Sequence, residues 1–476
     1  MKMKRTKIVA TISDKRCDVD FIRSLFEAGM DVIRINSAHL DIEGALKIIR
    51  NTRQVSDTIA ILIDTKGPEI RTTVCDEPVI LKKGETLRIT GDPGRKSEPG
   101  NIYVTHRPFA ADVAPGSCIL IDDGEIELKA IAREGNSLLC LVGNDGMLGS
   151  RKSVNVPGAK ICLPSLTDKD RTFIEMAVKE DIEFIAHSFV RNRQDVLDVK
   201  ALLESAGSAI KIIAKIENQE GVDNIDEILE EVYGIMVARG DLAIEIPYEK
   251  VPGIQRMIME KCIGKRKPVI VATQMLQSMI TNPRPTRAEV SDIATAIYWN
   301  TDAIMLSGET ANGKYPLEAV KTMTKVALEV ENNKQKYIEM PASTSTGEVS
   351  GYLAKVAVKT SIKVGARVII ADTFGGRTIR DMSAFRGINL ILAQCYQKRT
   401  MRELALSYGV YTEYQDKNES VDSFIHTALG KLVKTHDLLD SDIIVVLAGN
   451  FSGGSGFSFI EVGSVNYLKK RVAFID

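Results

Sequence analysis

Eight short runs of apolar, β-branched residues recur through the first two thirds of the chain, and they constrain its fold more than any other feature. These runs cover residues 7–13, 31–38, 59–67, 184–190, 211–217, 234–240, 269–276 and 302–309. Segments with helical periodicity, such as residues 19–29 and 194–207, lie between them. Nearly continuous Val/Ile runs that alternate with helices are typical of parallel strands covered by helices on the outer face. Eight such units predict a TIM barrel.

A long insertion interrupts this pattern after the third run. The third run begins at residue 59, and the fourth begins only at residue 184. Residues 72–158 lose the helical period and show short strands with turn signals, among them the favoured hairpin turn Asp123-Gly124. We therefore predict a small β-barrel domain at 72–158, which divides the TIM barrel into residues 1–71 and 159–340.

A third domain is predicted after the barrel. The polar, Ser/Thr-rich residues 341–349 have the composition of a linker. Beyond them, helical segments alternate with apolar runs at 366–373, 389–395, 409–414 and 442–450. This alternation predicts an α/β domain with at least four strands over residues 341–476.

The composition disfavours several classes of partner and site. The chain has 62 basic and 63 acidic residues, and its net charge of -1 gives no global field that would attract nucleic acid or an anionic membrane. Its seven cysteines include no C-x-x-C pair that would indicate zinc or a disulfide framework. No apolar run approaches the roughly 18 residues needed to span a bilayer, and the N-terminus has no signal-peptide pattern. We therefore expect a soluble cytoplasmic protein with no nucleic-acid or membrane partner.

Polar side chains gather where the predicted barrel strands end, which is where TIM barrels carry their active sites. Seven of the eight strands contribute Arg34, Asn36, Asp64, Thr65, Lys66, Ser188, Lys215, Glu217, Asp241, Thr273, Gln274 and Glu309. A strand often ends in a polar residue simply because the chain enters a solvated loop, and this explains any one of them. Convergence from seven strands instead predicts an active site.

Lys215 and Glu217 lie on the same side of their strand because side chains alternate along it. Taken alone, they are most simply a structural salt bridge. Glu217 and Asp241, however, end neighbouring strands, and Mg²⁺ is commonly held by one or two carboxylates with its other positions open to water and substrate oxygens. The turn at Arg239-Gly240-Asp241 offers free N–H groups to an anion. These groups suit either phosphoryl transfer or C–C bond chemistry on an oxo acid, and the residues alone leave both open.

Six segments at strand ends resemble the motifs of the pyruvate kinase family, in the family's order. They read DTKGPEIRT (64–72), AKIENQEG (214–221), MVARGDL (236–242), VATQMLQSM (271–279), NPRPTRAEVSD (282–292) and IMLSGETANGKYPLEAV (304–320). The resemblance implies transfer of a phosphoryl group from phosphoenolpyruvate to ADP, which gives pyruvate and ATP in glycolysis. It also implies that the β domain is a lid that excludes water and that the chain forms a homotetramer.

The family's functional residues carry over position by position. By this resemblance the catalytic residues are Lys215, Arg34, Thr273 and Glu309. The substrate contacts are Lys215, Gly240, Asp241, Thr273 and Ser188. The ligands of Mg²⁺ or Mn²⁺ are Glu217 and Asp241, and the ligands of K⁺ are Asn36, Asp64 and Thr65. The nucleotide contacts are Asn36, His39, Arg71 and Lys152.

Two departures from the family pattern concern the monovalent cation and the nucleotide. At the second strand the family usually reads Arg-x-Asn-Phe-Ser-His-Gly, whereas residues 34–40 read RINSAHL, so Ala38 replaces a hydroxyl that helps to bind the cation. Ser37 could compensate, but it belongs on the opposite face of a regular strand. Glu69, the acid associated with potassium-dependent members, is kept, and we expect K⁺. At the first strand, residues 11–15 read TISDK, where Thr-Ile-Gly-Pro-Ala is common.

The third domain contains two loops that resemble the family's sugar-phosphate effector site. Their candidate residues are Thr373, Gly375, Gly376, Arg377, Thr378, Ser452, Gly453, Gly454, Ser455 and Gly456. Glycine amides and hydroxyls at a helix start suit a phosphate. Phe374, however, stands where a small polar or basic residue is usual. We expect either a site for a sugar-phosphate or nucleotide effector or two purely structural turns.

Two other functions fit part of the pattern. A Mg²⁺-dependent oxo-acid aldolase or lyase on a TIM barrel shares the paired carboxylates but has no need of a nucleotide lid. A catalytically silent homologue kept for effector binding would explain the altered second strand. The intact Lys215, Glu217 and Asp241 argue against the silent homologue.

Overall fold

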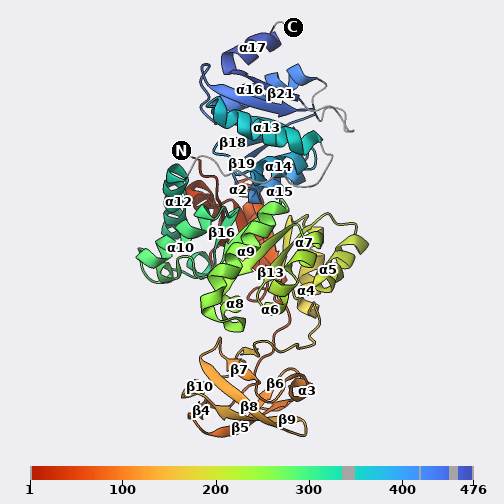
Figure 1. The fold of residues 1–476 in the computed structure, drawn as a ribbon, viewed down its shortest axis with the longest axis vertical. Coiled ribbons are helices and arrows are strands. Elements are labelled where there is room, and N and C mark those ends of the chain that lie inside the picture. The colour runs from red at the N-terminus through yellow and green to blue at the C-terminus, as the bar shows by residue number, and fades with distance from the viewer. Residues whose placement is uncertain (1–2, 335–348, 418–419, 450–458, 474–476) are drawn as a thin grey trace.

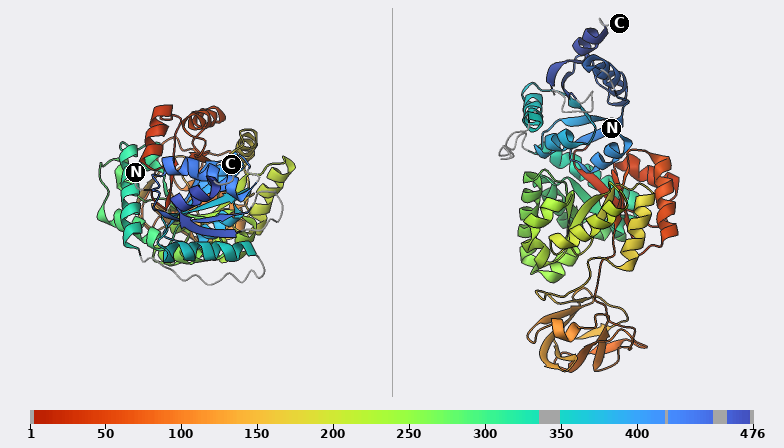
Figure 2. Two further views of the ribbon diagram at one scale, coloured as in Figure 1. Left: turned by 90° about the horizontal axis from the view of Figure 1, so that it is seen from above. Right: turned by 90° about the vertical axis from the view of Figure 1, so that its right-hand side faces the viewer.

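The computed structural model describes residues 3–334, 349–417, 420–449 and 459–473, arranged as three bodies along one long axis (Figure 1). A barrel forms the middle, a β domain lies at one end and an α/β domain lies at the other (Figures 1 and 2). The first described residues lie where the barrel meets the α/β domain, and the last described residues lie at the far tip of that domain. The predicted linker at 341–349 falls outside the described residues except for its last residue.

Eight parallel strands close the central barrel, as predicted, in the order β1-β16-β15-β14-β13-β12-β3-β2. They are β1 (Lys7–Thr11), β2 (Val32–Asn36), β3 (Ala60–Asp64), β12 (Phe184–His187), β13 (Lys211–Ile216), β14 (Gly234–Ala238), β15 (Val269–Ala272) and β16 (Ala303–Leu306). Each strand falls in one of the eight predicted runs. Side chains such as Val9, Phe184 and Ile270 fill the interior, and the alternate residues pack outward against helices.

Helices surround the barrel. In chain order they are α1 (Val19–Ala28), α2 (Ile42–Val55), α4 (Asp168–Lys179), α5 (Arg193–Ser205), α6 (Gln219–Asp223), α7 (Ile225–Glu231), α8 (Arg239–Glu245), α9 (Val251–Gly264), α10 (Arg287–Tyr298), α11 (Gly308–Ala311) and α12 (Pro316–Asn333), with 3₁₀ turns η1 (Tyr248–Lys250) and η2 (Gln277–Ile280). Local signals set their starts; Thr286 and Glu289, for example, form a capping box that opens α10. Among the described helices, none is long and apolar enough to cross a membrane.

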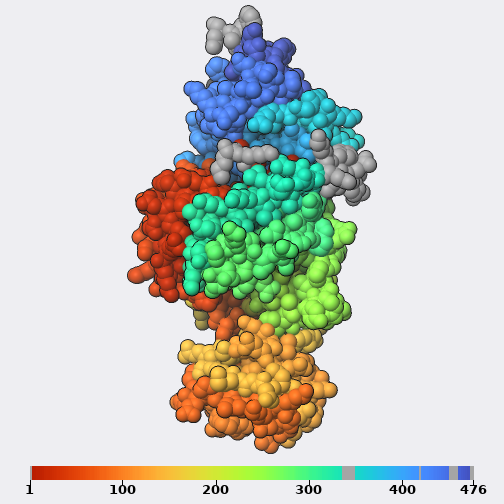
Figure 3. Space-filling model, turned by 90° about the vertical axis from the view of Figure 1, so that its left-hand side faces the viewer, coloured from red at the N-terminus to blue at the C-terminus, as the bar shows by residue number. Residues whose placement is uncertain are grey.

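The insertion after β3 folds as a separate β domain with its own apolar core. Its elements are β4 (Val79–Leu81), β5 (Thr86–Gly91), β6 (Asn101–Val104), α3 (Phe109–Asp112), β7 (Cys118–Ile121), β8 (Ile126–Glu134), β9 (Ser137–Val142), β10 (Gly146–Leu148) and β11 (Val154–Asn155). The strands form a six-stranded sheet, β11-β7-β8-β9-β5-β6, and a two-stranded sheet, β10-β4. The predicted turn at Asp123-Gly124 joins β7 to β8, with both residues at positive φ. A narrow waist separates this domain from the barrel (Figure 3).

The α/β domain is built on a five-stranded sheet with the order β19-β18-β17-β20-β21. The strands are β17 (Val368–Thr373), β18 (Leu390–Cys395), β19 (Val410–Tyr414), β20 (Ile443–Ala448) and β21 (Phe459–Ser464). The antiparallel edge strand β21 adds to the four predicted strands. The helices are α13 (Val349–Lys363), α14 (Arg377–Ala384), α15 (Lys398–Glu403), α16 (Val421–Thr435) and α17 (Val465–Ala473), with the 3₁₀ turn η3 (Leu404–Leu406). One apolar core lies between the sheet and α13 and α14, and another lies on the α16 and α17 side.

The α/β domain closes the barrel at the end where the strands begin. Leu406 of η3 is completely buried and belongs to the same cluster as Val9 and Leu62 of the barrel interior. Next to this contact, the Arg386 guanidinium donates to both carboxylate oxygens of Asp302, at 2.8 and 2.6 Å. The opposite end of the barrel, where the strands finish, faces the β domain (Figure 1).

We predict that Leu406→Ala destabilises the barrel. Truncating a buried leucine removes apolar contacts and leaves a cavity, which typically costs about 2–5 kcal/mol. Calorimetry should show a lower midpoint for thermal unfolding. Leu439→Ala is the control, because Leu439 is 64% exposed and its truncation should change little. Equal midpoints for the two variants would contradict the proposed contribution of Leu406 to the barrel floor.

Candidate active site

A buried ammonium group lies at the centre of the polar cluster at the barrel mouth. Lys215 Nζ lies 3.0 Å from Asp64 Oδ1 and 2.9 Å from Glu217 Oε1. It also donates a hydrogen bond of 2.7 Å to Ser188 Oγ. On the other side of Asp64, Arg34 Nε donates to Oδ2 at 2.6 Å. Strand ends that are distant in the sequence therefore deliver two cations to one carboxylate.

Electrostatics keep Lys215 protonated. Burial by itself lowers the pKa of this lysine, but the charges of Asp64 and Glu217 outweigh burial, and the net pKa is raised. The same reasoning applies in reverse to Asp64, where burial opposes ionisation but Arg34 and Lys215 lower the pKa. Lys215 is therefore built to stabilise negative charge rather than to accept a proton.

The carboxylates of Glu217 and Asp241 are suited to a divalent cation. Burial raises the pKa of both groups, and the nearby charge of Lys215 does not fully offset this effect. Glu217 Oε2 accepts from Phe189 N at 2.6 Å, whereas Oε1, although close to Lys215, has no hydrogen bond of good geometry. In the described part of the chain, no three His, Cys, Asp or Glu residues gather as a complete metal site. Two carboxylates with open positions match Mg²⁺ that completes its shell with water and substrate oxygens.

The end of β15 meets the start of α8 at a corner beside these carboxylates. Gly240 N donates to Thr273 Oγ1 at 2.8 Å. Thr273 and Gln274 follow β15 directly and both have positive φ, at 68° and 57°. Asp241, in the first turn of α8, therefore lies one residue from an amide that is tied to Thr273.

Two cavities of about 530 Å³ and 560 Å³ open at the barrel mouth. Both are lined by Arg34, Asn36 and His39. The first is also lined by the predicted residues Asp64, Thr65, Arg71, Lys215, Glu217 and Asp241. Thr273 lines the second. Most of the predicted residues thus lie around two cavities that share part of their lining and are together large enough for a small phosphorylated substrate and part of a nucleotide.

Three residues considered in the sequence analysis do not contribute side chains to the two mouth cavities. Lys152 lies in the β domain, pairs with Asp122 at 2.6 Å and lines neither of the two cavities, although its neighbour Arg151 lines the first. Glu309 is buried and accepts hydrogen bonds from the backbone of Leu276 and Ser307, a position that supports the loops around the site. Ser37 is fully buried, lines neither cavity and has no hydrogen-bond partner for its hydroxyl.

Only one of the two predicted effector loops can be described. Ser452, Gly453, Gly454, Ser455 and Gly456 lie outside the described residues. In the other loop, which joins β17 to α14, Gly376 N donates to Thr373 Oγ1 at 2.9 Å. Phe374 in the same loop packs on Tyr396 with ring centroids 4.7 Å apart. An aromatic side chain therefore occupies part of the space beside these backbone amides.

Comparison with known proteins decides the family. The model of the pyruvate kinase barrel domain matches residues 3–320, and the model of the pyruvate kinase alpha/beta domain matches residues 352–462. The chain belongs to the pyruvate kinase family.

Individual pyruvate kinases are similar to the chain in sequence or structure along nearly its whole length. The chain is 46% identical over 470 residues to the pyruvate kinase of Borreliella burgdorferi, with 98% of each chain covered. It is 42% identical over 479 residues to that of Geobacillus stearothermophilus, covering 98% of this chain and 80% of the relative. The crystal structure of a pyruvate kinase from Cryptosporidium parvum aligns with a TM-score of 0.91 and 35% identity, covering 97% of this chain and 96% of that one. The predicted family and fold are confirmed, and the aldolase or lyase alternative finds no support.

Two residues near the site of this pyruvate kinase family member were not predicted. Thr11 ends β1, the one strand without a predicted contribution, and its Oγ1 accepts from Arg34 Nη1 at 3.0 Å. Arg151 lines the first cavity from the β domain, and its carbonyl accepts from Arg71 at 2.8 Å. Thr11 could have been found from the sequence, because it is a polar residue near the end of the first apolar run. Arg151 could have been found because it directly precedes Lys152, the basic residue predicted to contact the nucleotide.

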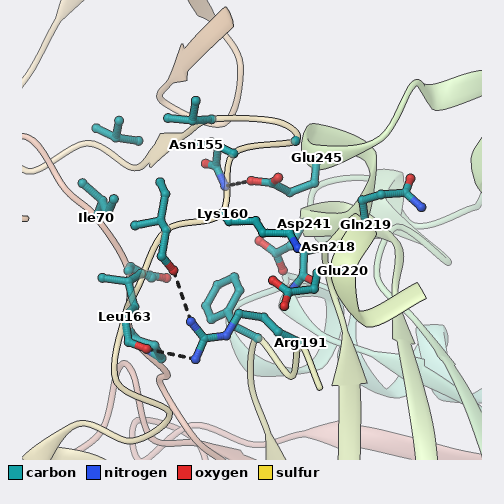
Figure 4. Close-up of a pocket in the computed structure, with 18 of the residues that line it drawn as sticks. Ile70, Asn155, Lys160, Leu163, Arg191, Asn218, Gln219, Glu220, Asp241 and Glu245 are labelled. Atoms are coloured by element: carbon teal, nitrogen blue, oxygen red, sulfur yellow. Dashed lines mark hydrogen bonds between the residues drawn. The ribbon is translucent and has the colours of Figure 1, made fainter. Parts of the chain in front are cut away.

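Both connections between the β domain and the barrel are anchored by ionic side chains. In the connection after β3, Lys66 N donates to Asp170 Oδ1 at 2.7 Å. In the returning connection, Arg191 donates to the carbonyls of Ile161 and Leu163 at 3.3 and 2.9 Å (Figure 4). Beside them lies a third cavity of about 330 Å³ between the two domains. Across it, Asn155 Nδ2 donates to Glu245 Oε1 at 2.9 Å (Figure 4).

We predict that Arg191→Met loosens the attachment of the β domain to the barrel. The substitution removes charge-assisted hydrogen bonds to Ile161 and Leu163, each worth about 1.5–3 kcal/mol. Limited proteolysis should therefore cut the connecting segment at 156–165 at least about tenfold faster. Arg193→Met is the matched control, because Arg193 pairs with Glu231 on the exposed side of the barrel and is 57% exposed. Equal cleavage rates in the two variants would show that Arg191 does not anchor this connection.

Proposed function

We propose that the chain transfers a phosphoryl group from phosphoenolpyruvate to ADP, giving pyruvate and ATP in glycolysis in the cytoplasm. The observation that carries this proposal is the buried Lys215 ammonium beside the Glu217 and Asp241 carboxylates at the mouth of the barrel. An ammonium next to a divalent-cation site suits a reaction in which negative charge moves between a phosphoryl group and an enolate.

Each polar group has a separate task in this proposal. Lys215 stabilises the phosphoryl group in transit and the enolate that remains after transfer. Arg34, held in place by Asp64 and Thr11, binds the phosphate. Ser188 donates to the Thr65 carbonyl at 2.6 Å and accepts from Lys215, which keeps the lysine oriented toward the substrate.

The carboxylate of the substrate is held at the corner between β15 and α8. The amides of Gly240 and Asp241 and the Thr273 hydroxyl are the donors, and Thr273 lies at the face where water delivers a proton to the enolate. Glu309 acts indirectly, through its hydrogen bonds to the backbone of Leu276 and Ser307.

Glu217 and Asp241 would hold Mg²⁺ or Mn²⁺, which supplies charge neutralisation at the substrate oxygens. Asn36, Asp64 and the Thr65 carbonyl would hold K⁺. Asn36 and Asp64 are paired in register at the ends of β2 and β3 and line the same cavity, which supports this assignment. Glu69 lines that cavity too.

The nucleotide is contacted by Asn36, His39 and Arg71 from the barrel side and by Lys152 from the lid. For Lys152 to reach the phosphates, lid closure must break its ion pair with Asp122. A closed lid excludes water, which would otherwise take the phosphoryl group in place of ADP.

A homotetramer is proposed from the family resemblance and is supported by an apolar stripe on α13. Val349 and Tyr352 are each 72% exposed and Val356 is 41% exposed, at spacings that place them on one face of the helix. An effector site for a sugar phosphate or nucleotide at Thr373, Gly375, Gly376, Arg377 and Thr378 is also proposed. The backbone amides of this loop support the proposal. The Phe374 ring occupies space beside them and so limits the size of the ligand that fits.

Lys215→Met tests the proposed function. Removing one preorganised charge stabiliser should lower the turnover of phosphoenolpyruvate by at least about 10²–10³-fold, with the fold retained. The measurement is ADP-dependent pyruvate formation by both proteins. Lys211→Met is the matched control, because Lys211 begins the same strand at the far end of the barrel. Activity of Lys215→Met close to wild type would remove Lys215 from the mechanism, and an inactive wild type would favour the catalytically silent homologue.

A second experiment tests the monovalent cation. We expect the rate in K⁺ to exceed the rates in Na⁺ and in a quaternary ammonium salt at fixed ionic strength, because Asn36, Asp64 and Thr65 remain in place. Equal rates in the three salts would contradict K⁺ dependence. They would indicate that K⁺ dependence is lost because Ala38 replaces the hydroxyl that helps to bind the cation.

A further inference from the structure

The corner that follows β15 has an unusual backbone. Thr273 and Gln274 are consecutive non-glycine residues in the left-handed region, with φ of 68° and 57°. Each such residue is disfavoured, and it persists where the surrounding structure imposes it. Interactions around this corner must therefore hold it in place.

Arg239 makes those interactions. Its Nη2 donates to the Thr273 carbonyl at 2.6 Å, and its Nε donates to the Ala272 carbonyl at 3.2 Å. Its Nη1 donates to Asp292 of α10 at 2.7 Å. The side chain is only 11% exposed, so these bonds are largely shielded from water. A planar guanidinium can span two successive carbonyls and a carboxylate at once, which an ammonium group does less well.

The hydrogen bonds of Thr273 explain why this arrangement matters for the site. The Thr273 hydroxyl accepts from Gly240 N and donates its proton to the Ala272 carbonyl at 2.7 Å. A substrate carboxylate that binds Thr273 must take that proton away from Ala272. The Ala272 carbonyl then keeps a partner, because Arg239 Nε also donates to it. Without Arg239, the same step would leave a carbonyl unsatisfied at a cost to binding.

We infer that Arg239, anchored by Asp292, is a positioning residue that fixes the Thr273 corner and frees the Thr273 hydroxyl to bind the substrate carboxylate. This inference rests on the proposed function, in which Thr273 and Gly240 hold that carboxylate. Arg239 lines neither of the two mouth cavities, so it acts through Thr273 rather than by touching the substrate. A purely structural role, joining α8 to α10, is the competing explanation.

A double-mutant cycle separates the two explanations. Arg239→Met should raise the KM for phosphoenolpyruvate at least about tenfold, while the KM for ADP changes less than about twofold. Thr273→Ala should have a similar effect, and the double variant should be little worse than Thr273→Ala, because Arg239 acts through Thr273. Arg239→Lys should recover only part of the loss. Arg256→Met is the control, since Arg256 pairs with Glu260 on an exposed face of α9 and should leave both KM values unchanged.

Additive effects of the two substitutions, or equal changes in both KM values, would overturn the inference. A wild type that makes no ADP-dependent pyruvate would instead refute the proposed function. In that case a crystal structure of Arg239→Met tests the corner directly, with Thr273 and Gln274 expected to leave the left-handed region and an unchanged corner contradicting the inference. Asp292→Asn, which weakens the anchor but keeps the arginine, replaces Arg239→Met if that variant does not fold.

Discussion

The burial of the Lys215 ammonium is the constraint on which the site depends. Removing an ammonium from water is costly unless carboxylates and hydrogen bonds compensate it. Asp64 and Glu217 supply that compensation within about 3 Å, and Ser188 adds a hydrogen bond. Asp64 belongs to β3 and Lys215 to β13, with β12 between them, and the parallel pairing of these three strands brings the groups to the same end of the barrel.

The same cluster explains why a divalent cation is expected. Lys215 is shared between Asp64 and Glu217, and Arg34 pairs with Asp64, so the three carboxylates of Asp64, Glu217 and Asp241 have only two of these cations between them. Burial raises the pKa of both of these carboxyl groups, which a bound Mg²⁺ would reverse. The preference for a metal thus follows from how the barrel distributes its charges, as well as from the two residues themselves.

Much of this arrangement could be predicted from the sequence, because the barrel repeats one pattern and active sites in this fold lie at strand ends. The β-branched runs predicted all eight barrel strands, and the polar strand ends predicted the residues around Lys215 and Glu217. The edge strand β21 was harder, because only one of its residues is exposed and none is fully buried, which leaves no clear alternation. Side-chain pairings between segments could not be predicted from the sequence. The Lys152 to Asp122 ion pair and the Arg239 contacts with the Thr273 corner, for example, depend on loop geometry.

The central claim is that Lys215 acts as a permanent cation, and nitrogen NMR of the lysine side chains tests it most directly. With the Lys215 signal assigned by comparison with Lys215→Arg, its Nζ shift can be followed as a function of pH in the metal-free protein. We expect the group to stay charged beyond the ordinary lysine pKa of about 10.4, because two buried carboxylates hold the proton. Deprotonation below about pH 9 would contradict this account and would make Lys215 a proton acceptor.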